Sequence, residues 1–173
     1  MEIPKDTVIE SLLSDAQHIA ERSNHSLAHH AVQCLQQLRK PLHTQAERNA
    51  AFAAVSSLYC QPGFSYGTPV YEGVIDDLDD LESKLAVYLD ADTIAAEAAA
   101  FGRGAVGSAI DQQREHDSLD EALCSYWENA ADTLAEVFHS LRDDGRFVVA
   151  YRAMERAFRD ELAKQSLTCS LFI

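Results

Sequence analysis

Apolar residues between positions 74 and 88 recur at alternating steps of four and three: Val74, Leu78, Leu81, Leu85 and Tyr88. This spacing places all five side chains on one face of an α-helix. Comparable apolar stripes recur along the rest of the chain, and no region of any length alternates with the period of two that a half-buried strand requires. The pattern therefore predicts an all-α protein.

The start and stop signals of the helices divide the chain further. A helix is expected over residues 6–22, and Asn24 is the expected cap of a second helix that runs to Lys40. Thr44 and Glu47 form a capping-box pattern at the start of a third helix. Later helices are expected over 73–90, 93–101, 119–141 and 146–164, with a weaker helical pattern over 108–117. We expect a single-domain bundle of six to seven helices, formed by residues 1–165, and an apolar C-terminal tail, residues 166–173.

The segment Asp143-Asp144-Gly145 has the composition of a tight turn between the last two expected helices. Two long helices joined by so short a connection pack side by side in opposite directions. We therefore expect a C-terminal antiparallel helical hairpin. The tail after it is expected either to fold back onto the bundle or to serve as a peptide for the groove of a partner.

Acidic residues are concentrated between positions 72 and 100, which hold nine carboxylates and one base, a net −8 out of −14 for the chain. On the 73–90 helix they would form a solvated face opposite the apolar stripe. Such a face repels phosphate backbones and anionic membranes, and it attracts basic surfaces. The residues expected to bind a partner are Asp76, Asp77, Asp79, Asp80 and Glu82.

Histidines and one glutamate are the weak candidates for metal ligands. His25 and His29 are four residues apart on a helix, and Glu136 with His139 forms the E-x-x-H spacing that di-iron bundles use. A metal site needs three or four such ligands to converge, and the sequence does not show that these four do. No cofactor is expected.

Residues 102–107 read Gly-Arg-Gly-Ala-Val-Gly and match the G-x-G-x-x-G spacing of dinucleotide-binding turns. That fingerprint requires a strand before it, whereas an alanine-rich helical segment precedes it here. We therefore interpret the three glycines, Gly102, Gly104 and Gly107, as an interruption of the helix.

The sequence favours a non-enzymatic acidic protein of the inhibitor, immunity, antitoxin or adaptor type that binds a basic protein surface. The alternative is a metal-binding helical-bundle enzyme or carrier that uses the histidine and glutamate ligands. A homodimer paired through the 74–88 stripe is a further possibility. Four widely spaced cysteines and an N-terminus without the features of a secretory signal peptide favour a cytoplasmic location.

Overall fold

The computed structural model describes residues 4–23, 25–61 and 63–173. All regular elements in these ranges are helical, so the prediction of an all-α fold with six to seven helices is confirmed. The helices group into two compact units, unit 1 (residues 1–90) and unit 2 (residues 91–173). We expected a division after residue 165, between a bundle (1–165) and a tail (166–173). The two units divide after residue 90 instead, so the expected division stays a prediction.

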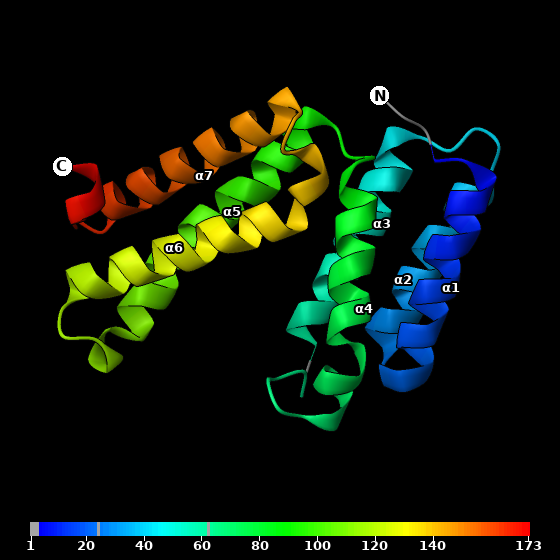
Figure 1. Ribbon diagram of the computed structural model, residues 1–173, viewed down its shortest axis with the longest axis horizontal. Coiled ribbons are helices and arrows are strands. Elements are labelled where there is room, and N and C mark those ends of the chain that lie inside the picture. Colours follow the sequence, from blue (N-terminus) through cyan, green and yellow to red (C-terminus); the bar gives the residue numbers. More distant parts are fainter. Residues whose placement is uncertain (1–3, 24, 62) are drawn as a thin grey trace. The chain divides into compact units, whose positions relative to one another are not determined.

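Unit 1 contains α1 (Asp6–Ser23), α2 (Ser26–Gln36), α3 (Gln45–Ser56) and α4 (Pro69–Ala86). Consecutive helices run in opposite directions, and each one packs against two neighbours because α4 returns to α1 (Figure 1). The apolar stripe of α4 is buried in this bundle, with Leu78 and Leu81 fully enclosed. The stripe forms the core of its own unit and is not exposed for pairing with a second chain, so a homodimer stays a prediction that this burial does not support.

Side-chain caps set the ends of these helices. The capping box between Thr44 and Glu47 is present at the start of α3, as predicted. Thr68 accepts a hydrogen bond from the Tyr71 amide and caps α4, which begins at Pro69, four residues earlier than expected. The predicted cap Asn24 lies outside the described residues, and His25 caps α2 by accepting a hydrogen bond from the Leu27 amide at 3.2 Å.

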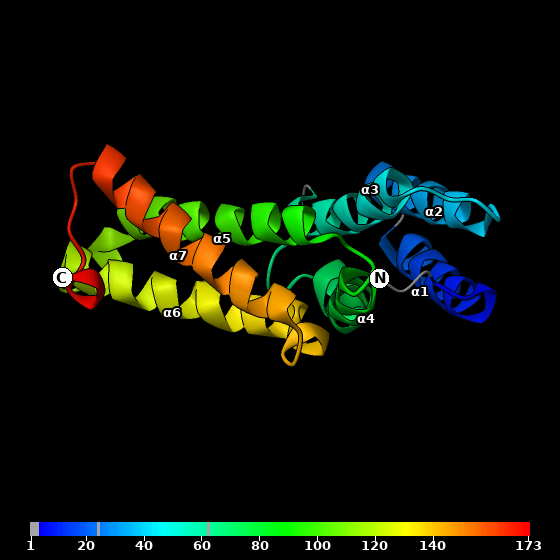
Figure 2. The same ribbon diagram turned by 90° about the horizontal axis from the view of Figure 1, so that it is seen from above.

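Unit 2 contains α5 (Ala91–Asp111), α6 (Leu119–Val137) and α7 (Gly145–Lys164). Helix α5 packs against both other helices, and α7 crosses it obliquely (Figure 2). The predicted antiparallel hairpin of α6 and α7 is confirmed. The Trp127 ring of α6 contacts Tyr151 and Phe158 of α7, with ring centroids 5.9 and 5.0 Å apart.

The predicted interruption at Gly102, Gly104 and Gly107 is wrong, because α5 continues through all three. Gly102 is buried where α7 crosses, and a Cβ there would clash with the Met154 carbonyl oxygen and lie 3.1 Å from the Phe158 nitrogen. The glycine thus permits close approach of two helix backbones. Because these amides lie inside a helix, they are not exposed at a helix start for a pyrophosphate.

Candidate functional site

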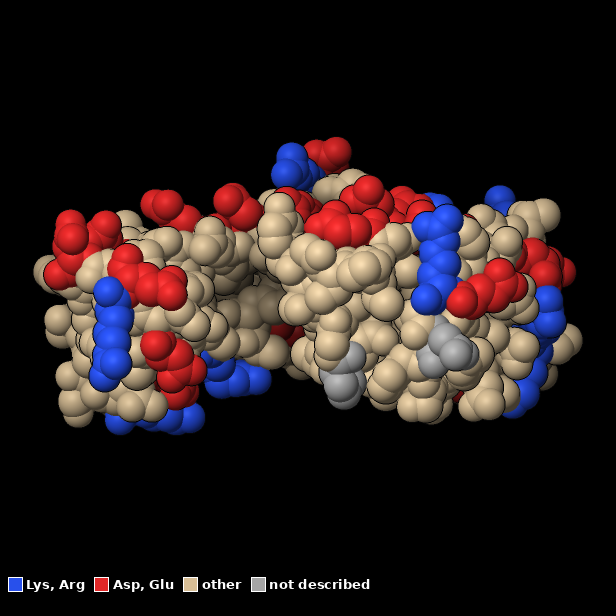
Figure 3. Space-filling view, turned by 90° about the horizontal axis from the view of Figure 1, so that it is seen from below, with Lys and Arg blue, Asp and Glu red and all other residues tan. Residues whose placement is uncertain are grey.

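Helix α4 carries all five of the residues that we expected to bind a partner. We use the name acidic face for five of its carboxylates: Glu72, Asp76, Asp77, Asp79 and Asp80. Glu72 and Asp76 are exposed and make no hydrogen bond or ion pair within the described residues. Figure 3 shows acidic side chains gathered along one edge of the part formed by residues 1–90, at the right of the view.

One base partly neutralises the acidic face. Lys84 Nζ lies 2.7 Å from Asp80 and 3.3 Å from Asp15 of α1, so it bridges two helices. The hydrogen bond that Lys84 donates to Asp80, and then the charge of Asp15, raise the pKa of Lys84. His18 of α1 lies 3.2 Å from Asp77 and adds a positive charge only when its ring is protonated. One lysine shared by two acids leaves most carboxylates of α4 without an ion pair, although Arg22 of α1 also reaches this helix and donates to the Gly73 carbonyl oxygen at 2.6 Å.

Glu82 departs from the expectation, because its side chain is buried with 6% exposure instead of lying on the solvated face. It accepts a hydrogen bond of 2.6 Å from the Ser56 hydroxyl at the end of α3. Glu82 follows Leu81 and precedes Leu85 by three residues, so it lies at the border of the apolar stripe, where the neighbouring helix covers it. Glu82 therefore belongs to the contact between α3 and α4.

Tyr59 joins this buried contact to the acidic face. Its hydroxyl donates a hydrogen bond of 2.6 Å to Asp79. Burial, and then the charges of Glu82 and Asp79, raise the pKa of Tyr59 strongly, so the phenol stays protonated and keeps donating. The bond orients Asp79 and leaves its negative charge in place.

The histidine candidates are not brought into a ligand set. The Nδ1 atom of His25 is occupied as the cap of α2, and His29 is exposed on the same helix. The Nδ1 atom of His139 lies 2.9 Å from the Glu136 carbonyl oxygen, within its own turn. Metal binding through His25, His29, Glu136 and His139 stays a prediction that no feature of the described residues supports.

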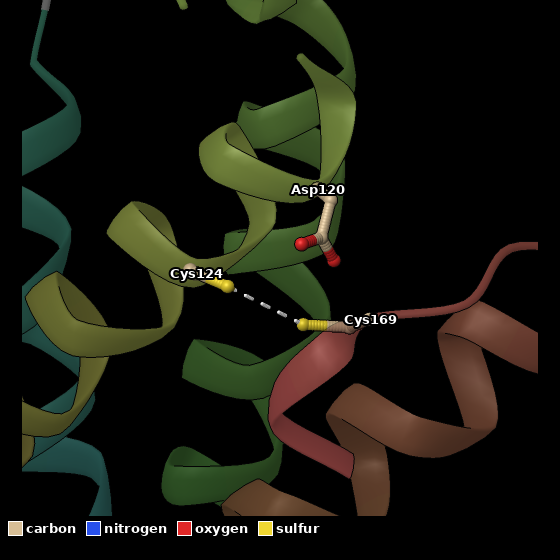
Figure 4. Close-up of side chains that lie close together, drawn as sticks. All are labelled: Asp120, Cys124 and Cys169. Atoms are coloured by element: carbon tan, nitrogen blue, oxygen red, sulfur yellow. Dashed lines mark hydrogen bonds between the residues drawn. The ribbon is translucent and has the colours of Figure 1, made fainter. Parts of the chain in front are cut away.

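A different group of donor atoms converges in unit 2. Asp120 and Cys124 of α6 lie beside Cys169, which follows α7, and their donor atoms are all within 4.8 Å of one another (Figure 4). Among the described residues, no other set of three metal-ligating side chains lies so close together. The i, i+4 spacing of Asp120 and Cys124 was visible in the sequence, but the arrival of Cys169 depends on how the last eight residues fold.

Comparison with known proteins adds no constraint on this chain: no family model matches it, and neither a curated protein nor a solved structure does so significantly. Among the helices of the described residues, none is long and apolar enough to cross a lipid bilayer.

Proposed function

We propose that this protein is a non-enzymatic binding protein whose acidic face docks onto a basic surface of another protein. The observation that supports this most is the net negative charge of α4, which carries six carboxylates and one lysine over Pro69–Ala86. Glu82 is excluded from the docking residues because it is buried. Inhibitors, immunity proteins, antitoxins and adaptors of this kind share the same electrostatics.

The charge of the acidic face is held in a fixed arrangement, which favours docking over diffuse attraction. Tyr59 orients Asp79 and Lys84 orients Asp80, while the helix itself is anchored by its buried stripe. Glu72 and Asp76 project from the same helix and are exposed. A partner with Arg or Lys at matching positions would form ion pairs without first ordering this surface.

The proposal requires binding that weakens with salt. Screening acts over about 10 Å at 0.1 M ionic strength, so capture of the partner from lysate on the immobilised full chain should fall steeply as salt rises. The variant Asp76→Asn with Asp80→Asn should lose the partner. The matched control is Glu128→Gln with Asp132→Asn, which removes the same charge from exposed positions on α6.

Retention of the partner by the control and its loss by the α4 variant would support docking at the acidic face. Equal losses in both variants would indicate attraction by net charge alone, and the proposal would be wrong. Equal capture at low and high salt would also contradict it, because a contact dominated by exposed carboxylates is screened by salt.

A further inference from the structure

Three side chains in unit 2 meet at the place where the C-terminal segment returns to α6. Asp120 and Cys124 are four residues apart on the first two turns of α6, so they share one face of the helix. Cys169 approaches that face from the segment that follows α7, and its Sγ lies 3.9 Å from the Sγ of Cys124 (Figure 4). We propose that Asp120, Cys124 and Cys169 bind a divalent cation that prefers thiolate ligands, with Zn²⁺ as the best fit.

The separation of the two sulfurs matches tetrahedral coordination. Two zinc–sulfur bonds of about 2.3 Å at a tetrahedral angle place the sulfurs about 3.8 Å apart, and a carboxylate oxygen at about 2.1 Å lies about 3.6 Å from each sulfur. The observed sulfur–sulfur distance is 3.9 Å. The carboxylate oxygen lies within 4.8 Å of both sulfurs, so it has to approach them more closely when the ion binds.

The donors are held in place before any ion arrives. The backbone nitrogen and the hydroxyl of Ser170 each donate to a different oxygen of Asp120, both at 2.8 Å. These bonds fix the orientation of the carboxylate beside the two thiols. Hydrogen bonds of this kind orient metal ligands in many protein sites, and each carboxylate oxygen retains a lone pair for the ion.

An aromatic cluster anchors the segment that supplies Cys169. The Phe172 ring lies 5.1 Å from that of Trp127 and 5.4 Å from that of Phe158, centroid to centroid. The Arg159 guanidinium lies 4.8 Å from the centroid of Phe172. The expectation that the tail folds back is thereby met for Phe172, and the neighbouring Cys169 is buried with 2% exposure.

Binding exchanges protons for the ion. Burial raises the pKa of the Cys169 thiol, so the thiol is protonated before metal arrives. Each ion forms two metal–sulfur bonds, displaces the protons of Cys124 and Cys169 to solvent, and forms one bond to the Asp120 oxygen. Three protein ligands leave a fourth tetrahedral position for water, and no oxidant or reductant takes part.

Titration of the reduced 173-residue chain with Co²⁺ tests the site, because cobalt bound by thiolates shows charge-transfer absorption and tetrahedral cobalt shows visible bands. Both signals should saturate at one ion per chain and disappear when Zn²⁺ is added. Cys124→Ser should abolish the charge-transfer signal, and Asp120→Asn should weaken binding at least tenfold. Cys60→Ser is the matched control and should bind as the unmodified protein does, because Cys60 is exposed and belongs to unit 1.

A second measurement uses the unmodified protein and does not depend on the folding of a variant. Zn²⁺ should protect Cys124 and Cys169 from alkylation, as measured by mass spectrometry. Cys60 should be alkylated at the same rate with and without Zn²⁺. The proposal would be overturned if neither cobalt signal appears and Zn²⁺ does not protect Cys124 and Cys169 from alkylation. So would rapid formation of a Cys124–Cys169 disulfide with glutathione disulfide in a protein that takes up no metal, because the pair would then be a redox element.

Discussion

Unit 1 and unit 2 carry the same net charge of −7, from thirteen acids and six bases in residues 1–90 and fifteen acids and eight bases in residues 91–173. They distribute it differently. Helix α4 of unit 1 has six acids and one base, whereas α7 of unit 2 has three acids and five bases. Unit 2 also has a negative helix, because α6 carries five acids and no base, but the hairpin partner of α6 is the basic helix α7. We place docking of a basic partner on α4 because Tyr59 and Lys84 hold two of its carboxylates in a fixed arrangement.

The two units also join their helices by different means. In unit 1, α3 contacts α4 through a buried carboxylate, where Ser56 donates to Glu82 and Tyr59 reaches Asp79. In unit 2, the backbones of α5 and α7 approach closely at Gly102, and the rings around Trp127 fill the space beside α6. A polar contact depends on charge and pH, whereas a backbone contact depends on the absence of a side chain.

The largest expected effect comes from a charge placed in the core of unit 1. Leu81→Asp should lower the free energy of unfolding by about 3–5 kcal/mol, because Leu81 is fully buried and an unpaired carboxylate there loses its hydration. Chemical denaturation, with hydrogen exchange read on peptides from each unit, should locate the loss in residues 1–90. The control Asp76→Asn should stay within about 0.5 kcal/mol. A stable variant that changes only from dimer to monomer would contradict the burial of this stripe.

The next effect distinguishes the glycines of α5. Gly102→Ala should destabilise unit 2 by about 1–3 kcal/mol, because the added Cβ meets the backbone of α7. Gly104→Ala is the matched control: nothing lies within 4 Å of a Cβ there, so the change should stabilise the helix by about 0.5–1 kcal/mol. Thermal unfolding of both variants measures the difference. Similar shifts of the same sign would show that α7 does not approach α5 at Gly102.

The polar contact in unit 1 should make its stability depend on alkaline pH. The folded state raises the pKa of Tyr59, while the unfolded phenol loses its proton near pH 10. Unfolding therefore becomes easier as pH rises above about 10, since the unfolded state then binds fewer protons. Tyr59→Phe should cost about 1 kcal/mol at neutral pH and flatten the alkaline decline. Denaturation at a series of pH values checks this, and an unchanged slope in the variant would show that another group is responsible.

The smallest effect should be equal in the two units. Thr44 caps α3 and Ser118 caps α6, and each accepts a hydrogen bond from the amide three residues later, at 3.2 and 3.1 Å. Thr44→Ala and Ser118→Ala should each cost about 1 kcal/mol. Denaturant unfolding of the two variants measures this pair, and a difference of several kcal/mol would mean that one cap also has a role in tertiary packing.

Local signals in the sequence were sufficient to locate most helices. The stripe from Val74 to Tyr88 predicts the buried side of α4, and Thr44 with Glu47 predicts the start of α3. These features depend on residues within one or two turns of each other, because capping bonds and helical periodicity are local. The expected start of α4 at residue 73 is four residues too late, because Thr68 caps the helix and Pro69 occupies its first turn, where proline is favoured.

Contacts between residues distant in the chain decided the rest. Glu82 resembles its acidic neighbours in sequence, and only the position of Ser56 on another helix shows that it is buried. Gly102 resembles Gly104, and only the crossing of α7 separates a required glycine from a replaceable one. Cys124 and Cys169 are 45 residues apart and meet because the final segment turns back. The sequence by itself determined where helices form and where charge is concentrated, because both are local properties. The tertiary structure decided which carboxylates are exposed to solvent and which thiols lie close together, because burial and proximity depend on neighbours from other helices.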